Sequence, residues 1–174
     1  AQRTVAVMAR VTERVKEVMV DEGDRVPAGG VLVRLDASKV EAQLAGVAAD
    51  LEQLTAERAA EEARRAALET SGAYWATEVE RLRRLRQQNS ISQSALDEVV
   101  DQLSTVRGNL EASREKVKAL AAGLQSLQAR QQELRSRRTD YDLEAPYVGV
   151  VTLRAIDPGD QAAPGKLLFE VETT

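Results

Sequence analysis

Apolar residues recur at alternating intervals of three and four from Ala95 to Asp142. Eleven of the fourteen positions on this repeat are apolar, and most residues between them are charged, Gln or Ala. An apolar repeat of about 3.5 residues sustained over this length predicts an α-helix that packs along a coiled-coil seam. The predicted seam positions are Leu96, Val99, Leu103, Val106, Leu110, Ser113, Val117, Leu120, Leu124, Leu127, Gln131, Leu134, Arg138 and Tyr141.

A second repeat of the same kind precedes it, and nine of its thirteen positions are apolar. Between Arg58 and Arg65 the repeat is polar, and we expect the alanines around this break to take over the seam locally, as at a stutter. Those alanines are Ala59, Ala60, Ala63, Ala66 and Ala67. The seam positions are Val40, Leu44, Val47, Leu51, Leu54, Arg58, Glu61, Arg65, Leu68, Gly72, Trp75, Val79 and Leu82.

The two helical segments are separated by the only helix-breaking stretch of the region, at 88–93. Asn89 suits a left-handed C-terminal residue, and Ser92 or Ser94 suits the N-cap of the following helix. Long helices joined by a short connection run antiparallel. We therefore predict an α-helical hairpin over 37–142 with its tip near 87–93.

The start of the first helix carries two N-cap residues, Asp36 and Ser38, and Glu41 is placed to form a capping box with Ser38. The only tryptophan, Trp75, falls on the seam beside Tyr74. We interpret Trp75 as a packing residue and not as part of a ligand site, because bulky seam residues form the core of coiled coils.

Short valine-rich runs with alternating polarity lie on both sides of the hairpin, at 4–20, 31–35, 149–153 and 167–171. Such runs predict strands that are half buried against a small core. Glycine- and proline-containing turns separate them.

The two flanks repeat one another at an offset of 136 residues. Each half has too few strands to bury a core alone, so we predict one β sandwich built from residues 1–36 and 143–174. Together with the inserted hairpin this gives an α+β fold. Glu13 occupies the position of Gly149, which departs from the repeat. The other matched positions include Gly23 with Gly159, Asp24 with Asp160, Gly29 with Gly165 and Leu32 with Leu168.

Composition removes several classes of function. The chain has a net charge of −4, and its arginine clusters have acidic neighbours and no interleaved aromatics, so nucleic acid is not an expected partner. It contains neither Cys nor His, which removes thiol nucleophiles, the commonest general base and most zinc sites. We predict no catalytic residues, no cofactor and no metal site.

No apolar run approaches the roughly 18–20 residues that span a membrane, and no signal peptide opens the sequence. Residue 1 already lies in a predicted strand. We interpret the chain as a fragment, or as a mature chain trimmed at both ends.

The flanking segments resemble the lipoyl or biotinyl domain of the periplasmic adaptor family, also called membrane fusion proteins, of the HlyD, AcrA and MacA type. The resemblance rests on four motifs and on the inserted hairpin. The motifs are Val-x-Glu-Gly-Asp-x-Val-x-x-Gly-x-x-Leu-x-x-Leu-Asp at 20–36, Ala-Pro-x-x-Gly-x-Val at 145–151, Pro-Gly-Asp at 158–160 and Pro-Gly-x-x-Leu-Phe at 164–169.

The predicted tip resembles a second motif of this family, in which Arg, Leu and Ser are separated by four and seven residues. Arg81, Leu85 and Ser92 have that spacing. The resemblance implies that they contact a TolC-type outer-membrane channel. Leu85 is suited to a groove between partner helices, and the Arg81 guanidinium to carbonyl or carboxylate groups. The structural alternative is that Leu85 packs inside the hairpin while Ser92 caps the second helix.

The resemblance further implies a non-enzymatic adaptor of a tripartite efflux pump or type I secretion system. It would lie in the periplasm, anchored to the inner membrane in the full-length protein, and would bridge an inner-membrane transporter to the channel. Several copies, expected to be six in the full-length assembly, would form a ring. The membrane-proximal and β-barrel domains that the family adds are not part of this sequence.

Two other functions fit parts of the sequence. A coiled-coil scaffold without a channel partner would tolerate changes at Leu85 and Ser92. A lipoyl or biotinyl carrier domain would need a modifiable lysine in the turn joining its halves, but the nearest lysine, Lys39, falls in the first turn of the predicted helix.

Overall fold

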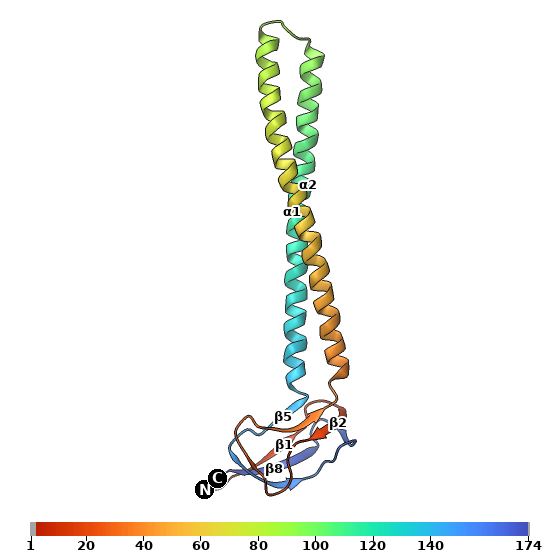
Figure 1. Cartoon of the computed structure of the whole chain (residues 1–174), viewed down its shortest axis with the longest axis vertical. Helices are drawn as coiled ribbons and strands as arrows, with labels where there is room; N and C mark the ends of the chain where they lie inside the picture. The colour runs from red at the N-terminus through yellow and green to blue at the C-terminus, as the bar shows by residue number, and fades with distance from the viewer. Residues whose placement is uncertain (1–2, 174) are drawn as a thin grey trace. The chain divides into compact units, whose positions relative to one another are not determined.

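The computed structural model describes residues 3–173. Two long helices, α1 (Ser38–Gln87) and α2 (Gln93–Thr139), lie between two sets of short strands in the chain, as Figure 1 shows. Residues 49–128 form one compact unit, and the residues on both sides of them form a second unit that contains the strands. The predicted α+β fold, with a helical hairpin inserted into a β sandwich, is confirmed.

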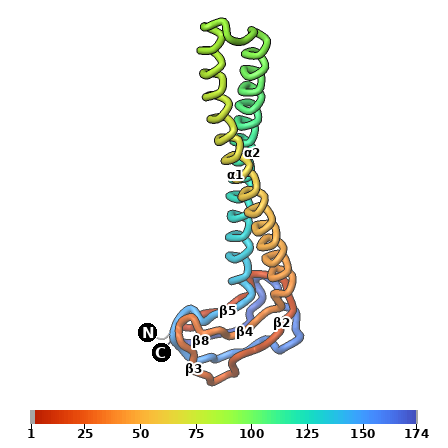
Figure 2. The backbone as a smooth tube through the Cα atoms, turned by 45° about the horizontal axis from the view of Figure 1, so that its top comes forward, coloured from red at the N-terminus to blue at the C-terminus, as the bar shows by residue number. Residues whose placement is uncertain are grey.

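The strand-containing unit consists of two antiparallel four-stranded sheets, with strand orders β1-β8-β6-β3 and β5-β4-β2-β7. Each sheet takes strands from both halves of the chain, so neither half forms a four-stranded sheet without the other (Figure 2). The strands are β1 (Thr4–Met8), β2 (Glu13–Val18), β3 (Arg25–Val26), β4 (Val31–Leu35), β5 (Asp142–Glu144), β6 (Gly149–Arg154), β7 (Gln161–Ala162) and β8 (Leu167–Thr173).

The sequence repeat is also a repeat of structure. At an offset of 136 residues, β2 corresponds to β6, β3 to β7 and β4 to β8. The two sheets therefore have equivalent strand orders. Hydrogen bonds between the halves follow the same rule. The Val151 N–H donates to the Asp24 carbonyl at 3.0 Å, and the Val15 N–H donates to the Asp160 carbonyl at 2.8 Å. The two halves are therefore related by an approximate two-fold axis.

The repeat is broken where Glu13 of the first half corresponds to Gly149 of the second, and the reason is local. A Cβ at Gly149 would lie 2.3 Å from the carbonyl oxygen of Glu172, because β8 continues alongside it to Thr173. The equivalent strand of the first half, β4, ends at Leu35, and Glu13 there is half buried and lies 3.7 Å from Lys39 Nζ. Glycine is needed only where a neighbouring backbone comes this close.

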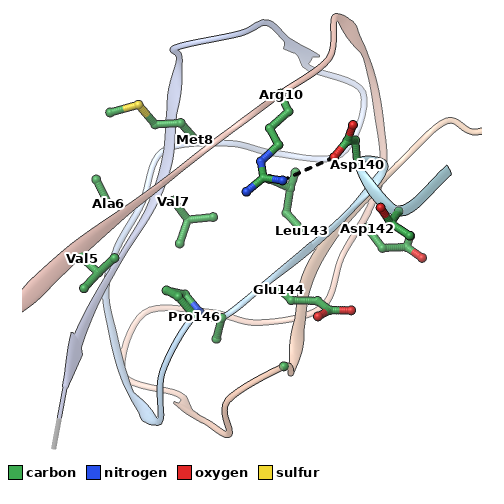
Figure 3. A pocket seen from close by; sticks show the side chains of 13 residues that line it. Val5, Ala6, Val7, Met8, Arg10, Asp140, Asp142, Leu143, Glu144 and Pro146 are labelled. Atoms are coloured by element: carbon green, nitrogen blue, oxygen red, sulfur yellow. Dashed lines mark ion pairs between the residues drawn. The ribbon is translucent and has the colours of Figure 1, made fainter. Parts of the chain in front are cut away.

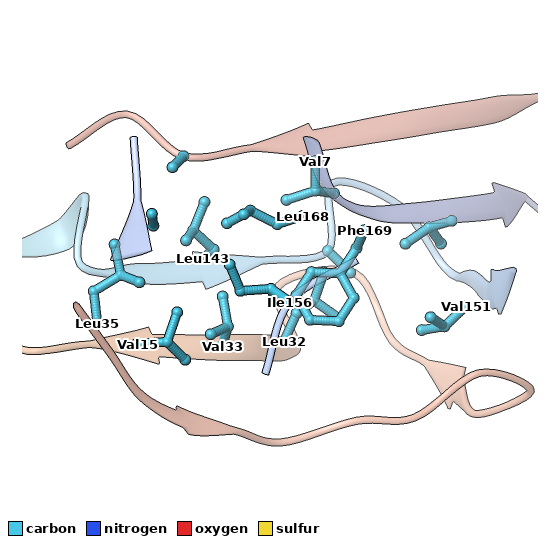
Figure 4. Packing of buried hydrophobic residues seen from close by; sticks show 14 of the residues in the cluster. Val7, Val15, Leu32, Val33, Leu35, Leu143, Val151, Ile156, Leu168 and Phe169 are labelled. Atoms are coloured by element: carbon cyan, nitrogen blue, oxygen red, sulfur yellow. The ribbon is translucent and has the colours of Figure 1, made fainter. Parts of the chain in front are cut away.

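The core of the sandwich lies between the two sheets, and Figure 4 shows residues from both halves meeting there. Burying one such leucine or phenylalanine contributes roughly 1.5–3 kcal/mol. The largest fully buried side chains of this core are Phe169, Leu32, Leu35, Ile156, Leu168, Val15, Val33, Val151 and Val171.

Both predicted coiled-coil seams are confirmed, because every seam position is buried or half buried. The buried seam positions include Val40 and Val79 on α1 and Leu103, Val106, Val117 and Leu134 on α2. Small residues allow close packing at two places. A Cβ at Gly72 would lie 3.8 Å from Val106, and one at Gly123 would lie 3.0 Å from Leu54.

The predicted stutter between Arg58 and Arg65 is wrong. The five alanines of this region are exposed, whereas Glu61 keeps its seam position and is only 5% exposed. The reason is the small hydroxyl residue opposite, since Ser113 leaves room for the carboxylate and donates to its Oε1 at 2.6 Å. Lys116 Nζ lies 3.2 Å from the other oxygen, Oε2. The seam therefore runs through a polar layer without changing its phase.

The ends of the helices differ in detail from the prediction. Ala37 occupies the N-cap position of α1, because its carbonyl accepts a hydrogen bond of 2.9 Å from the Glu41 N–H, so neither predicted cap residue, Asp36 or Ser38, takes that position. Asp36 Oδ1 instead accepts a hydrogen bond of 3.0 Å from the Ser38 N–H, and this bond lowers the pKa of the Asp36 carboxyl. The expected capping box is absent among the described residues, since Glu41 pairs with Arg138 at 3.1 Å. Helix α2 ends at Thr139, and the predicted helical region up to 142 overlaps the start of β5.

Candidate functional site

The C-terminus of α1 shapes the hairpin tip. Asn89 has a φ of 55°, the left-handed conformation predicted for it. The Asn89 N–H donates to the Arg86 carbonyl at 3.0 Å, and the Ser90 N–H donates to the Leu85 carbonyl at 2.9 Å. These two bonds are those of a Schellman motif, which satisfies the last carbonyls of a helix and turns the chain away from it.

Ser92 provides the N-cap of α2. Its Oγ accepts a hydrogen bond of 3.1 Å from the Ala95 N–H and lies 3.3 Å from Ser94 Oγ. Of the two serines predicted as caps, Ser92 is therefore the one that holds the helix start. The Ser92 side chain is exposed, and a serine hydroxyl can donate one hydrogen bond while its Oγ accepts another, as it does from Ala95.

Arg81 lies on the exposed surface of α1, and its side chain is 56% exposed. It binds Glu78 through both ends of its guanidinium group, with Nε donating to Oε2 at 3.1 Å and Nη2 donating to Oε1. The hydrogen bond from Arg81 lowers the pKa of the Glu78 carboxyl and raises the pKa of the guanidinium. The ion pair orients Arg81 along the helix and leaves other N–H groups of the fork available.

Leu85 is half buried, so its side chain is neither fully packed inside the hairpin nor fully exposed to a partner. It lies one helical turn beyond Arg81, and Ser92 lies across the turn that joins the helices. Leu82 and Ile91 are half buried as well. The tip thus presents partly exposed apolar surface next to a guanidinium and a hydroxyl group.

Arg86 has a role that the motif did not indicate. Its Nη1 donates to Asn89 Oδ1 at 3.3 Å, and its Nε donates to Gln93 Oε1 at 3.3 Å. Arg86 therefore joins the end of α1 to the turn and to the start of α2. A signal was present in the sequence, because Arg86 is the next seam position after Leu82 on the heptad repeat.

Trp75 is half buried on the seam, in agreement with its predicted packing role. Tyr74 is exposed, and the two rings meet edge to face with centroids 5.1 Å apart. Over residues 3–173 the structure has no group of three or more acidic side chains placed to hold a metal ion. No helix in this range is long and apolar enough to cross a membrane.

Comparison with known proteins identifies the family. The model of the CzcB-like barrel-sandwich hybrid domain matches residues 3–173, and the chain belongs to this family. The resemblance to periplasmic adaptor proteins is thereby confirmed. No curated protein matches the sequence.

Solved structures share the fold at low sequence identity. The periplasmic adaptor protein EmrA is 19% identical, with a TM-score of 0.50 over 97% of this chain and 71% of that one. MacA from Actinobacillus actinomycetemcomitans is 16% identical, with a TM-score of 0.58 over 99% of this chain and 52% of that one. A MacA–MexA chimera containing the α-hairpin domain of Pseudomonas aeruginosa MexA is 16% identical, with a TM-score of 0.51. The match covers 98% of this chain and 48% of the chimera. The chain thus spans about half of the last two proteins.

Proposed function

We propose that this chain is the hairpin and lipoyl-like part of a periplasmic adaptor subunit. The subunit serves a tripartite efflux pump or a type I secretion system, and it bridges an inner-membrane transporter to a TolC-type outer-membrane channel. The work of such a subunit is assembly and conformational coupling, without bond chemistry. Membership of the CzcB-like family supports the adaptor class.

The tip geometry is the observation that supports the channel as partner. Leu85 is only half buried, and the exposed Arg81 and Ser92 display polar groups on the same end of the hairpin. Transferring the rest of a leucine side chain into a groove between partner helices contributes up to roughly 1.5–3 kcal/mol. The guanidinium fork and the Ser92 hydroxyl would supply directional bonds to backbone carbonyls at the partner's surface.

A single tip is small as an interface. Stable interfaces bury roughly 1,200–2,000 Å², more than a turn and two helix ends can cover. Useful affinity therefore requires several tips bound at once, as a ring of subunits provides. We propose a ring, with six copies as the expected number in the full-length assembly.

The carrier alternative is not favoured by the structure around Lys39. The connection between β4 and β5, where a carrier domain has its modified lysine, is here the whole helical hairpin. Lys39 lies in the first turn of α1, 3.7 Å from Glu13 Oε1. It is not displayed at the end of a turn, as a swinging arm requires.

The test is site-directed cross-linking from Ser92→Cys in the full-length protein, in cells that express the channel. Residues 1–174 contain no native cysteine, so the introduced one is the sole thiol in this part of the protein. We expect a specific adduct with the channel that is lost on Leu85→Asp, together with loss of transport. Tyr74→Cys, also exposed on α1 but further from the tip, is the matched control and should give no adduct.

Leu85→Asp must leave the protein folded for this test to be informative, so helix content and the thermal transition are measured alongside. If Ser92→Cys gives no adduct, and Leu85→Asp leaves transport intact, the tip does not bind a channel. The coiled-coil scaffold would then be the better account of the hairpin.

A further inference from the structure

A groove of about 680 Å³ lies in the strand-containing unit. Its walls are the edge strands β1 and β5, and Figure 3 shows the side chains that line it. Val7 and Leu143, both part of the sandwich core, lie at its base. The groove is therefore an opening between the two sheets, with core side chains that are each 7% exposed at its base.

Both walls have backbone groups available for pairing. Among the described residues β1 pairs only with β8, and β5 pairs only with β4. In an antiparallel pair, every second residue of an edge strand directs its N–H and C=O away from the partner. Unprotected edges of this kind accept an additional strand.

The structural repeat shows that the two walls differ in charge. The offset of 136 residues places Ala6 of β1 in the position of Asp142 of β5, and Met8 in the position of Glu144. Met8 is 48% exposed. If the acidic side chains served only to protect an edge, the equivalent edge would need the same protection. One wall is instead acidic and the other neutral and apolar.

Arg10 shows which chemistry the acidic wall accepts. This residue follows β1, and its guanidinium reaches across the groove to within 3.5 Å of Asp140 Oδ1 (Figure 3). The other two carboxylates of this wall, Asp142 and Glu144, are less fully paired with cations. Asp142 Oδ2 lies 3.2 Å from Arg138, but its Oδ1 is shielded from solvent without a hydrogen-bond partner. Within residues 3–173 Glu144 has no ion pair. Of the three acids on this wall, Glu144 thus has no cation beside it among the described residues, and Asp142 is paired through one oxygen alone.

We propose that this groove binds an extended segment of a partner protein that carries Lys or Arg at alternate positions. The segment adds to the free edge of β1 through backbone hydrogen bonds, the mode of recognition in which a strand joins an exposed sheet edge. Its cationic side chains reach Asp142 and Glu144 as Arg10 reaches Asp140. A second copy of this chain is the less suitable occupant, because two β5 edges would bring like charges together. The proposal concerns a different surface from the tip and does not depend on channel binding.

The probe is a fluorescein-labelled peptide of about nine alternating Lys and Val residues, the length of a long strand. The control peptide has Pro in place of Val, which keeps the charge but removes every second N–H donor. Binding to the full chain is measured by fluorescence anisotropy. We expect the Lys–Val peptide to bind about tenfold more tightly than the Lys–Pro peptide, since both charge and pairing contribute.

The variant Asp142→Asn with Glu144→Gln should weaken binding of the Lys–Val peptide about tenfold, because two charge-assisted contacts are lost. Asp50→Asn with Glu52→Gln removes the same charge from α1 and should leave binding unchanged. The backbone amides of Ala6 and Met8 should shift in heteronuclear NMR spectra on peptide addition. Equal affinity for the two peptides, or absence of binding, would overturn the proposal. A concentration-dependent dimer that resists the peptide would overturn it too, in favour of a second copy as occupant.

Discussion

Ser113 on α2 donates a hydrogen bond of 2.6 Å to the buried carboxylate of Glu61 on α1. Glu61 is among the most buried residues of its helix, more so than the leucines on either side of it along the seam. A carboxylate removed from water is costly unless hydrogen bonds and an opposite charge accompany it. Ser113 provides the hydrogen bond, and Lys116 provides the opposite charge, with its Nζ 3.2 Å from Glu61 Oε2.

This pair predicts how the stability of the hairpin depends on pH. The Ser113 hydrogen bond, with Lys116 and Arg64 adding to it, lowers the pKa of the Glu61 carboxyl below its ordinary value of 4.5. The unfolded state therefore binds the proton more readily than the folded state. The contribution of Glu61 is fully present above about pH 4.5 and is lost as the pH falls through the lower folded pKa.

Glu61→Gln should flatten this part of the pH dependence, because an amide does not titrate. The measurement is urea unfolding followed by helix circular dichroism at pH 7, 4.5 and 3, with the difference between variant and parent plotted against pH. Glu52→Gln, which removes a charge from an exposed position of α1, is the control and should run parallel to the parent. A Glu61→Gln curve that also runs parallel would contradict the role assigned to the carboxylate.

The β sandwich should fold without the helical hairpin. The Leu35 N–H donates to the Tyr141 carbonyl at 2.8 Å, so the two ends left by removing the hairpin are already paired as neighbouring strands. Replacing residues 36–140 with Asn-Gly supplies the turn that such a two-residue connection prefers. We expect a domain of roughly 70 residues with a β-type circular dichroism spectrum and one cooperative thermal transition, a size at which single cores are adequate but marginal.

Leu168→Ala in the shortened domain is the matched variant. Leu168 is fully buried, and truncating such a leucine costs about 2–5 kcal/mol, enough to unfold a marginal domain. A shortened chain that lacks a cooperative transition, or whose transition Leu168→Ala leaves unchanged, would show that the sandwich needs the hairpin to fold.

Much of this architecture was predictable because two periodic signals are strong. The 3.5-residue repeat identified both seams, and the 136-residue offset related the two halves of the sandwich. Features that depend on partners far apart in the chain were missed. The polar layer depends on the hydrogen bond between Glu61 and Ser113. Glu41 does not form the predicted capping box because it forms an ion pair with Arg138. The groove follows from strand order, which no local pattern carries.

Two glycines should respond in opposite directions to replacement by alanine. At Gly149 the new Cβ would lie 2.3 Å from the Glu172 carbonyl, a backbone atom that moves only if β6 and β8 separate, so destabilisation by about 1–3 kcal/mol or more is expected. At Gly108, inside α2, no atom lies within 4 Å of the new Cβ. There alanine should stabilise by about 0.5–1 kcal/mol, because it loses less backbone entropy in a helix. Chemical unfolding of both variants checks the two signs, and a neutral Gly149→Ala would contradict the close approach.

Ser92 combines helix capping with proposed channel contact, and two substitutions separate these roles. Ser92→Ala removes the acceptor of the Ala95 N–H and should cost about 1 kcal/mol of stability. Ser92→Asp keeps a good N-cap, so the hairpin should remain as stable as the parent, but it replaces the hydroxyl donor by a charged acceptor. If the hydroxyl binds the channel, transport by the full-length protein falls with Ser92→Asp although its thermal transition is unchanged. If capping is the only role of Ser92, transport falls with Ser92→Ala alone, in proportion to the lost stability.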